Sequence, residues 1–502
     1  MQRFKINLAS TKFLVLGAVL LALSIPAFQT ISDPDFFWHI KVGQWILQNG
    51  FPHHDLFTYT VSQHPFITHE WLSEVIMSFL FFSIGSGAVV MFWGFVIWFG
   101  FLGILLTVDK KVPYIFIGIT MVLGVAAGQA IWSPRTQMLT FTFTVILLLL
   151  LRKYRTDLNR KWIYPLPLLF LIWVNAHGGF FLGLGILGLY LIGMSFLYRK
   201  DLRKIKAFLL IGISCFMVVL INPSFIWIYP YSIQTQFSSV QQSLIVEWAS
   251  PNFHSGDVFF FEVMFLLLIV ALIFNRRRIH FLDVLLLVVG IVLAFQSVRH
   301  IAIFVVIVTP ILAELLGGIW ETYKSHFPKY REPPRVKLIA IINCITLFLV
   351  FAVASSYLLP ALRAPLESKE IKQNFPVDAI TFMQHRKSPG NVFNVYHWGG
   401  YFVYRLWPAQ KAYIYGDAAV LGDSFLKEFA GVDEVQPGYK AVLDKYKVNW
   451  ILFQTDSPLV VVLSKDSEWG ILYKDKVATI LVRRSSVSSG YIPTKPYSSP
   501  VE

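Results

Sequence analysis

Hydrophobic residues along this chain gather in long runs instead of alternating singly with polar residues. About 20 apolar residues are what a helix needs to cross the ~30 Å hydrocarbon core of a bilayer. Eleven runs near this length predict eleven transmembrane helices. We place them at 13–31, 88–108, 113–132, 137–151, 162–175, 179–197, 206–222, 258–274, 279–296, 301–319 and 338–357.

The composition agrees with a membrane protein. Of the 502 residues, 56% are hydrophobic and 14% are charged, whereas about a quarter of the residues in a soluble domain are charged. The net charge of +14 does not indicate a nucleic-acid partner, because the basic residues lie in short loops between the apolar runs. Cytoplasmic loops are where Lys and Arg accumulate. Cys215 and Cys344 both fall within apolar runs and predict no redox role.

The distribution of Lys and Arg sets the predicted orientation. With a cytoplasmic N-terminus, the cytoplasmic segments hold 22 Lys and Arg residues, whereas the external loops before residue 358 hold only Lys41, Arg135 and Arg299. This excess predicts a multi-pass plasma-membrane protein with its N-terminus in the cytoplasm. We interpret 13–31 as an uncleaved helix and not as a signal peptide, because no small-x-small cleavage site precedes the next polar segment.

One further apolar segment, 70–84, determines whether the number of membrane crossings before each later loop is odd or even, and so on which side that loop lies. It is short for a crossing, and its polar residues, including Glu70 and Glu74, share one helical stripe opposite its large apolar residues. That pattern is typical of a helix lying along the membrane surface. The segment 37–48 carries a similar polar stripe. We therefore predict a long first external loop, 32–87, that holds two interfacial helices.

The composition changes after residue 357. Residues 358–484 combine charged residues with short apolar segments, which predicts a small α/β domain. The odd number of preceding helices makes this domain extracytoplasmic, attached to an all-α membrane domain over 1–357. The Ser- and Pro-rich tail, 485–502, is predicted to be disordered. Expected strands lie at 392–396, 412–415, 450–454, 471–473 and 478–482, with helices at 399–406, 424–430 and 437–446.

Unusual polar residues gather on the predicted external side, at or just beyond helix ends. Charged groups at membrane depth are costly and tend to face a cavity, so their gathering across five loops predicts a polar cavity that opens outward. Some have simpler explanations: Asn222-Pro223 ends a helix, Gly178-Gly179 forms a turn, and Arg135 anchors to lipid phosphate. The candidates are Asp33, Asp35, His39, His69, Glu70, Arg135, Gln137, Asn175, His177, Glu247, Arg299 and His300.

Two pairs among these candidates carry specific chemistry. Arg grips phosphate through two parallel hydrogen bonds, and phosphate is the anion expected near lipid, so we predict that Arg135 and Arg299 bind one. Asp33 and Asp35 directly follow the first helix and offer a carboxylate for general-base catalysis or metal binding. An Asp-x-Asp pair alone is a weak motif. Its position directly after the first helix is what indicates a functional role.

These residues resemble those of the GT-C class of membrane glycosyltransferases. The class includes oligosaccharyltransferase catalytic subunits, protein O-mannosyltransferases and lipid A aminoarabinose transferases. The shared features are an acidic residue after the first helix, interfacial helices in a long first loop and, in many members, an external C-terminal domain. The motifs that carry the resemblance are Asp33-Pro34-Asp35-Phe36-Phe37-Trp38-His39, His69-Glu70-Trp71-Leu72 and Asn175-Ala176-His177-Gly178-Gly179.

A second motif lies in the C-terminal domain. His397-Trp398-Gly399-Gly400-Tyr401, followed by Gly416-Asp417, is similar to the oligosaccharyltransferase order of a Trp-Asp-Tyr-Gly motif and a later acidic motif. Gly399 stands where that motif has Asp, so the resemblance does not carry over acceptor-peptide recognition of that kind.

The resemblance implies transfer of a sugar from a polyprenyl-phosphate lipid in the membrane to an extracytoplasmic glycan, lipid or protein acceptor. Asp35 would be the base, with Asp33 as the alternative, and Arg135 and Arg299 would hold the donor phosphate. Oligosaccharyltransferases use a divalent metal and the other two relatives do not. The resemblance therefore does not decide whether this protein binds a cofactor such as Mg²⁺ or Mn²⁺. The pocket residues would be His39, His69, Glu70, Gln137, Asn175, His177, Glu247 and His300.

Two functions from other classes remain as alternatives. A transporter needs polar residues near mid-membrane, commonly in two corresponding halves with broken helices, whereas here they lie on one side and no internal repeat is evident. A non-catalytic scaffold for envelope polysaccharide assembly or export would keep the fold without the chemistry. Such a scaffold would tolerate the loss of Asp35.

Overall fold

The computed structural model describes residues 10–326, 336–363, 366, 368–386, 390–488 and 490–498. Contacts between residues divide the chain into two compact units. Unit 1 consists of Met1–Thr30, Gly87–Asn222 and Ile245–Arg363, and unit 2 consists of Ile31–Ser86, Pro223–Leu244 and Ala364–Glu502. The domain boundaries expected from composition stay a prediction.

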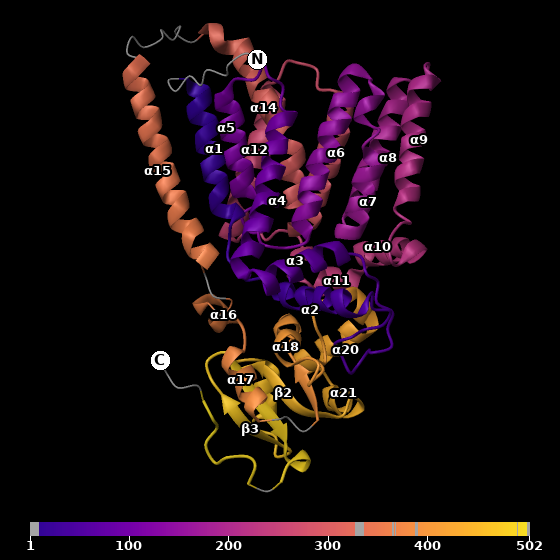
Figure 1. Cartoon of the computed structure of the whole chain (residues 1–502), viewed down its shortest axis with the longest axis vertical. Coiled ribbons are helices and arrows are strands. Elements are labelled where there is room, and N and C mark those ends of the chain that lie inside the picture. Colours follow the sequence, from indigo (N-terminus) through magenta and orange to yellow (C-terminus); the bar gives the residue numbers. More distant parts are fainter. Residues whose placement is uncertain are drawn as a thin grey trace. The chain divides into compact units, whose positions relative to one another are not determined.

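Unit 1 is a set of apolar helices that run side by side (Figure 1). Each membrane span expected from the sequence corresponds to one of them. The helices are α1 (Thr11–Ala27), α4 (Ser86–Thr107), α5 (Tyr114–Ala127), α6 (Gln137–Asp157), α7 (Leu166–Ala176), α8 (Phe180–Leu197), α9 (Leu202–Val218), α12 (Phe259–Phe274), α13 (Phe281–Gln296), α14 (Ile301–Tyr323) and α15 (Val336–Arg363).

The apolar helices make this a multi-pass membrane protein. Among the described residues, six helical segments are long and apolar enough to cross a membrane, and they contain α4, α6, α8, α12, α14 and α15. Shorter apolar helices include α1, α5 and α13. The fold is therefore mostly helical, with a number of apolar helices between six and eleven.

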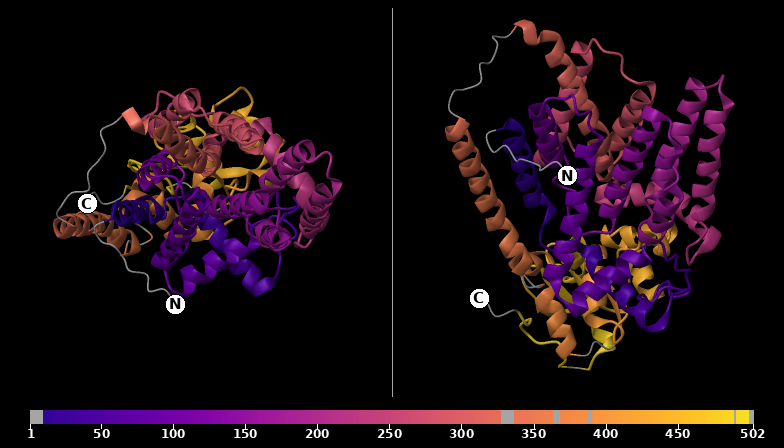
Figure 2. Two further views of the ribbon diagram at one scale, coloured as in Figure 1. Left: turned by 90° about the horizontal axis from the view of Figure 1, so that it is seen from above. Right: turned by 45° about the horizontal axis from the view of Figure 1, so that its top comes forward.

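Burial distinguishes the helices of unit 1. Nearly every side chain of α14 from Ile301 to Leu315 is buried, and its approach to α5 requires glycine. A Cβ on Gly124 would lie 2.8 Å from Thr309 Oγ1. By contrast, α15 packs mainly on α1, lies at the edge of the unit (Figure 2) and exposes most of its apolar side chains, as a helix facing lipid does.

Unit 2 contains a helical part and a mixed sheet with its helices. The helical part is built from α2 (Pro34–Asn49), α3 (Trp71–Ser83), α10 (Ile228–Phe237) and α11 (Ser239–Leu244). The helices around the sheet are α16 (Lys369–Asn374), α17 (Val377–His385), α18 (Gly399–Leu406), α19 (Ala418–Leu421), α20 (Asp423–Asp433), α21 (Tyr439–Lys445) and α22 (Pro458–Leu463).

The contact between α2 and α3 is unusually close because Gly43 lies at it. A Cβ on Gly43 would meet Ser78 Cβ at 2.8 Å and the Glu74 backbone still nearer. The polar side of α3 therefore faces α2, and Glu74 and Ser78 are buried. Its apolar side is exposed, with Phe79 at 57%, which is the arrangement that a surface-lying membrane helix requires.

The sheet has the strand order β1-β2-β4-β3. Its strands are β1 (Asn391–Asn394), β2 (Val448–Gln454), β3 (Trp469–Lys474) and β4 (Ala478–Arg483). β1 and β2 are parallel, with Phe393 opposite Ile451, and the other pairs are antiparallel. The small α/β arrangement expected near the C-terminus is thus present as a mixed sheet.

Two expected features of this region differ in detail. The segment 412–415 lies outside the four-stranded sheet and pairs instead with the first loop, where the Ala412 N–H donates to Phe57 O at 2.9 Å. In the expected disordered tail, Tyr497 pairs with β3, and Lys474 N–H donates to its carbonyl at 2.8 Å. Residues 489 and 499–502 of that tail lie outside the described residues.

Candidate functional site

The N-terminus of α2 holds the two aspartates that follow the first apolar helix. Asp33 is the N-cap, and its Oδ1 accepts the Asp35 N–H at 2.9 Å. Asp35 lies in the first turn, where a carboxylate is stabilised by the helix dipole, and its Oδ1 accepts the Trp38 Nε1–H at 3.0 Å. Asp33 therefore has a structural task, whereas Asp35 is half-buried beside an indole.

Gly416 lies against the Asp35 carboxylate. A Cβ at this position would overlap Asp35 Oδ1 and would lie 2.7 Å from Trp38 Nε1. The Gly416 carbonyl accepts a hydrogen bond from Tyr396 Oη at 3.0 Å. The C-terminal motif singled out in the sequence thus contacts the acidic motif of the first loop, and both belong to unit 2.

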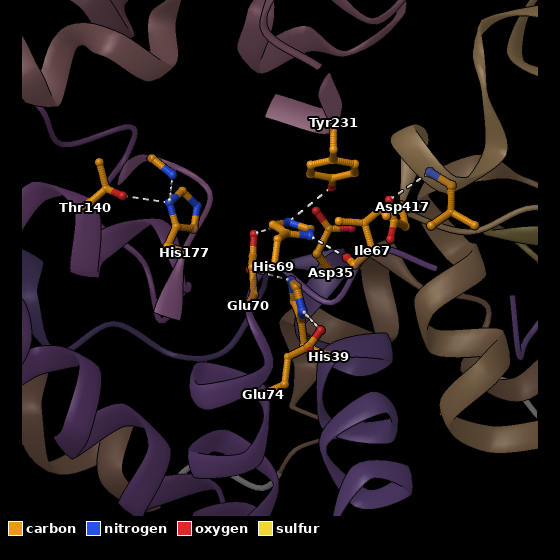
Figure 3. A network of polar contacts seen from close by, with 12 residues as sticks. Asp35, His39, Ile67, His69, Glu70, Glu74, Thr140, His177, Tyr231 and Asp417 are labelled. Carbon is orange, nitrogen blue, oxygen red and sulfur yellow. Dashed lines mark hydrogen bonds and ion pairs between the residues drawn. The ribbon is translucent and has the colours of Figure 1, made fainter. Parts of the chain in front are cut away.

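A chain of alternating acidic and basic side chains extends from α2 and α3 (Figure 3). His39 Nδ1 lies 3.0 Å from Glu74 Oε1, and His39 Nε2 lies 3.8 Å from Glu70 Oε2. The other Glu70 oxygen lies 2.8 Å from His69 Nε2, and Tyr231 Oη lies 3.3 Å from the same nitrogen. All five side chains come from unit 2.

The neighbouring carboxylates keep His39 and His69 cationic. Burial opposes protonation of His39, but the hydrogen bond to Glu74 and the charge of Glu70 outweigh burial and raise the pKa of His39 to about 9. Burial is likewise outweighed at His69, where Glu70 and Asp417 raise the pKa to about 9. Both imidazoles therefore carry a proton at neutral pH, and each faces a carboxylate.

Asp417 is a buried carboxyl near this chain. Its Oδ1 caps α19 by accepting the Val420 N–H at 3.2 Å. Its Oδ2 is buried and has no hydrogen-bond partner among the residues that the structure describes. Burial raises the pKa of Asp417, although the positive charge of His69 partly offsets that effect. A buried polar atom of this kind can serve an incoming polar group.

In unit 1, Arg135 and Glu247 form an ion pair. The Ser297 hydroxyl donates to Glu247 O at 2.8 Å, and Arg299 lies 4.9 Å above the Trp248 ring. Burial raises the pKa of Glu247, but the nearby charges of Arg135 and Arg299 outweigh it and lower the value. The two arginines expected to bind phosphate therefore lie around one carboxylate.

His300 belongs to this same part of unit 1. Its ring centroid lies 6.3 Å from that of Trp248, and it precedes α14 directly. Gln137 is the first residue of α6, two positions after Arg135. Four expected site residues, Arg135, Glu247, Arg299 and His300, are thus brought together.

His177 and Asn175, at the end of α7, make structural contacts. His177 Nδ1 accepts the Gly179 N–H at 3.0 Å and lies 2.6 Å from Thr140 Oγ1 (Figure 3), which accepts the Trp173 indole N–H at 3.0 Å. Asn175 Nδ2 donates to the carbonyls of Leu171 and Ile221. These bonds fix the turn between α7 and α8, and they give His177 and Asn175 a role in positioning.

The structure places the twelve expected residues in both units. Asp33, Asp35, His39, His69 and Glu70 belong to unit 2, and the other seven belong to unit 1. Three residues near the candidate site, Glu74, Tyr231 and Asp417, were not expected from the sequence as site residues. Glu74 follows Glu70 by one helical turn, a spacing that could have indicated a shared face, whereas Tyr231 is distant in sequence and gives no such signal.

The resemblance to oligosaccharyltransferases raises the question of a divalent metal. Among the residues that the structure describes, no group of three or more His, Cys, Asp or Glu side chains has an arrangement that could hold a metal ion. No residue in the described part of the chain is therefore assigned as a metal ligand.

No protein-family model matches the chain, and no curated protein matches it by sequence. Solved structures do match its fold. The archaeal oligosaccharyltransferase AglB from Archaeoglobus fulgidus, in complex with an inhibitory peptide and a dolichol-phosphate, aligns with a TM-score of 0.56 at 11% identity, over 95% of this chain and 74% of that one. The same oligosaccharyltransferase tethered with an acceptor peptide gives 0.58 at 11% identity, over 96% and 74%.

ArnT from Cupriavidus metallidurans bound to undecaprenyl phosphate aligns with a TM-score of 0.51 at 14% identity, over 96% of this chain and 98% of that one. The resemblance to GT-C glycosyltransferases is therefore confirmed as a likeness of fold over nearly the whole chain. The low identity limits this likeness to the fold.

Proposed function

We propose that this protein is a membrane glycosyltransferase that moves a sugar from a polyprenyl-phosphate donor to an extracytoplasmic acceptor. The observation that carries the proposal is the half-buried Asp35 carboxylate, held by Trp38 and contacted by Gly416, within a GT-C fold. The structural relatives are complexes with dolichol-phosphate and undecaprenyl phosphate, which supports a lipid-phosphate donor.

In the proposed reaction, an acceptor nucleophile attacks the anomeric carbon of the donor sugar. The bond from that carbon to the phosphate oxygen breaks, and the polyprenyl phosphate leaves with the electron pair. Asp35 takes the acceptor's proton as general base. Arg135 and Arg299 bind the phosphate and stabilise its growing negative charge.

The remaining residues are proposed to shape the polar environment of the reaction. His39 and His69 supply positive charge at neutral pH, and Glu70 and Glu74 fix their orientation. Glu247 holds Arg135 until the donor phosphate binds. His177 and Asn175 position the turn after α7, and Gln137 and His300 are proposed as further polar residues of the unit 1 part of the site.

Asp35 is favoured over Asp33 as the base because Asp33 caps α2. Asparagine caps a helix about as well as aspartate, so Asp33→Asn should keep both the fold and the transfer activity. Asp35→Asn keeps the size of the side chain but removes the base. We expect it to bind donor and to lose roughly 10²- to 10⁴-fold in transfer rate.

The experiment compares purified wild-type protein, Asp35→Asn and Asp33→Asn in binding and transfer assays with polyprenyl-phosphate-linked sugars. Loss of transfer in Asp33→Asn alone would show that Asp33, and not Asp35, is the base. Wild-type transfer rates in both variants would overturn the catalytic proposal and favour a scaffold. Arg135→Ala tests the donor site separately, because it should weaken donor binding before it affects the chemistry.

A further inference from the structure

A cavity of about 1290 Å³ lies in unit 1, at the helix ends that are joined by short basic loops. Its wall includes apolar side chains from several helices, among them Leu16, Leu105 and Ile311. It also includes eight Lys and Arg side chains and four carboxylates. The cavity therefore combines apolar surface with an excess of positive charge, the two properties that an anionic amphiphile needs.

The inner arginines of this cavity are already paired. Arg152 makes two parallel hydrogen bonds to Glu314, both 3.1 Å long, and a third to Thr107 O at 2.9 Å. Arg155 pairs with Asp283 at 2.8 Å. These pairs leave no net charge for a ligand, and they fix the wall formed by α6, α13 and α14.

The outer cations are different. Lys110, Lys111, Lys153, Arg277 and Arg278 are exposed, and none of them forms an ion pair with another residue in the described ranges. They come from three separate loops or helix ends and converge on one hollow. Basic residues that only set the membrane orientation do not need to line a hollow. Basic residues that line a cleft together, by contrast, concentrate an anion there.

We infer that this cavity binds the phosphate headgroup of an anionic lipid, with the lipid chain along the apolar wall. Basic pockets between membrane helices bind such headgroups, and Arg277 and Arg278 can each grip a phosphate through parallel hydrogen bonds. Free phosphate shares this headgroup chemistry but makes no use of the apolar wall. The inference does not depend on the proposed transfer reaction.

The experiment titrates the purified full-length protein in neutral detergent with dioctanoyl phosphatidylglycerol, dioctanoyl phosphatidylcholine and inorganic phosphate, using thermophoresis. We expect phosphatidylglycerol to bind most tightly. Arg277→Ala/Arg278→Ala should weaken that binding at least tenfold, because each basic residue near an anionic lipid surface contributes ~1 kcal/mol. Lys110→Ala/Lys111→Ala, on another loop, should weaken it similarly.

The matched control is Arg199→Ala/Lys200→Ala, which removes the same charge from the exposed end of α8 without changing the cavity wall. It should bind phosphatidylglycerol as the wild type does, and all variants should elute as single species with wild-type thermal midpoints. Equal binding of phosphatidylcholine, or equal loss in the control, would overturn the inference. Phosphate binding as tight as phosphatidylglycerol, with the same response to the variants, would overturn the lipid as the ligand.

Discussion

At the scale of single residues, the contact of Gly416 with Asp35 is the most sensitive feature of the candidate site. A methyl group at Gly416 would overlap the Asp35 carboxylate and crowd Trp38. A displacement of about 1 Å in a catalytic group can cost on the order of 10²-fold in rate. The absence of a side chain at residue 416 therefore protects the geometry of the proposed base.

We predict that Gly416→Ala lowers the transfer rate by roughly 10- to 100-fold while the protein stays folded. The measurement is steady-state transfer with a polyprenyl-phosphate-sugar. The control is Gly431→Ala in α20, where a Cβ would meet nothing closer than 3.4 Å, and alanine favours the helix. Unchanged transfer in Gly416→Ala would show that the position of Asp35 does not limit the reaction.

The paired histidines predict a pH dependence of stability. Their pKa is raised to about 9 in the folded protein, above the ~6.5 of an unfolded chain. Their stabilising contribution is therefore complete below about pH 6.5 and is lost as the pH rises through 9. As the pH rises from about 6.5 to 9, the thermal midpoint of the wild type should decrease, whereas that of His39→Gln should decrease less.

The control for this prediction is His53→Gln, which replaces an exposed histidine in the same unit. It should keep the wild-type slope of thermal midpoint against pH. A wild-type midpoint that rises from pH 6.5 to 9 would contradict the paired, protonated state of His39 and His69.

At the scale of elements, the ion pair between α6 and α13 connects two apolar helices. Asp283 is 7% exposed at its side chain and lies 2.8 Å from Arg155 and 3.8 Å from Arg152. Removing one partner of a buried pair leaves an uncompensated charge and costs about 3–5 kcal/mol. Replacing both partners by apolar residues of similar volume avoids that penalty.

We therefore predict that Asp283→Leu lowers the thermal midpoint more than Arg155→Met/Asp283→Leu does. The comparison is a thermal unfolding series in detergent that also includes Arg155→Met, so that the coupling between the two positions can be separated. Lys440→Met is the control, since Lys440 is exposed in its pair with Asp466, and such pairs contribute 0–1 kcal/mol. Additive losses at residues 155 and 283 would contradict the pairing.

The orientation of α3 is a second prediction at this scale. Because its polar face is buried against α2 and its apolar face is exposed, we expect it to lie along the membrane surface. Single cysteines at Gln63 and Ser83, before α3 and at its end, should then both react with an impermeant thiol reagent in intact cells. Labelling of Ser83 from the cytoplasmic side only would show that α3 crosses.

The sequence predicted the helices better than the site. An apolar run repeats the same local signal at many positions, so every expected span has its helix, and several helix ends differ by a few residues. Pairing between distant segments has no such signal. Ala412 bonds to Phe57, and Tyr231 meets His69, through folding that no local pattern encodes. Asp35 could be selected because it follows a helix directly, whereas the charge interaction of Asp417 with His69 arises only from the three-dimensional arrangement.

At the scale of the whole molecule, the described fold explains how one chain combines lipid-facing and polar parts. Unit 1 exposes apolar residues along helices such as α15, and unit 2 encloses buried charged residues in a mixed α/β arrangement. A fold shared with GT-C glycosyltransferases at 11–14% identity shows that this arrangement tolerates almost complete sequence change. Within this chain, the close approach of α2 and α3 at Gly43 is one contact that limits which residues the fold can accept.

The 22-to-3 distribution of Lys and Arg between the two sets of loops predicts the orientation of the molecule in the membrane. We predict that single cysteines at Ser239 and Ser464, both exposed in unit 2, react with an impermeant thiol reagent in intact cells. A cysteine at Asn159, on the exposed loop after α6, should react only after the membrane is permeabilised. The background carries Cys215→Ala and Cys344→Ala so that only the introduced thiol is labelled. Labelling at Asn159 from outside would reverse the orientation, whereas labelling at Ser239 but not at Ser464 would show that an odd number of crossings separates them.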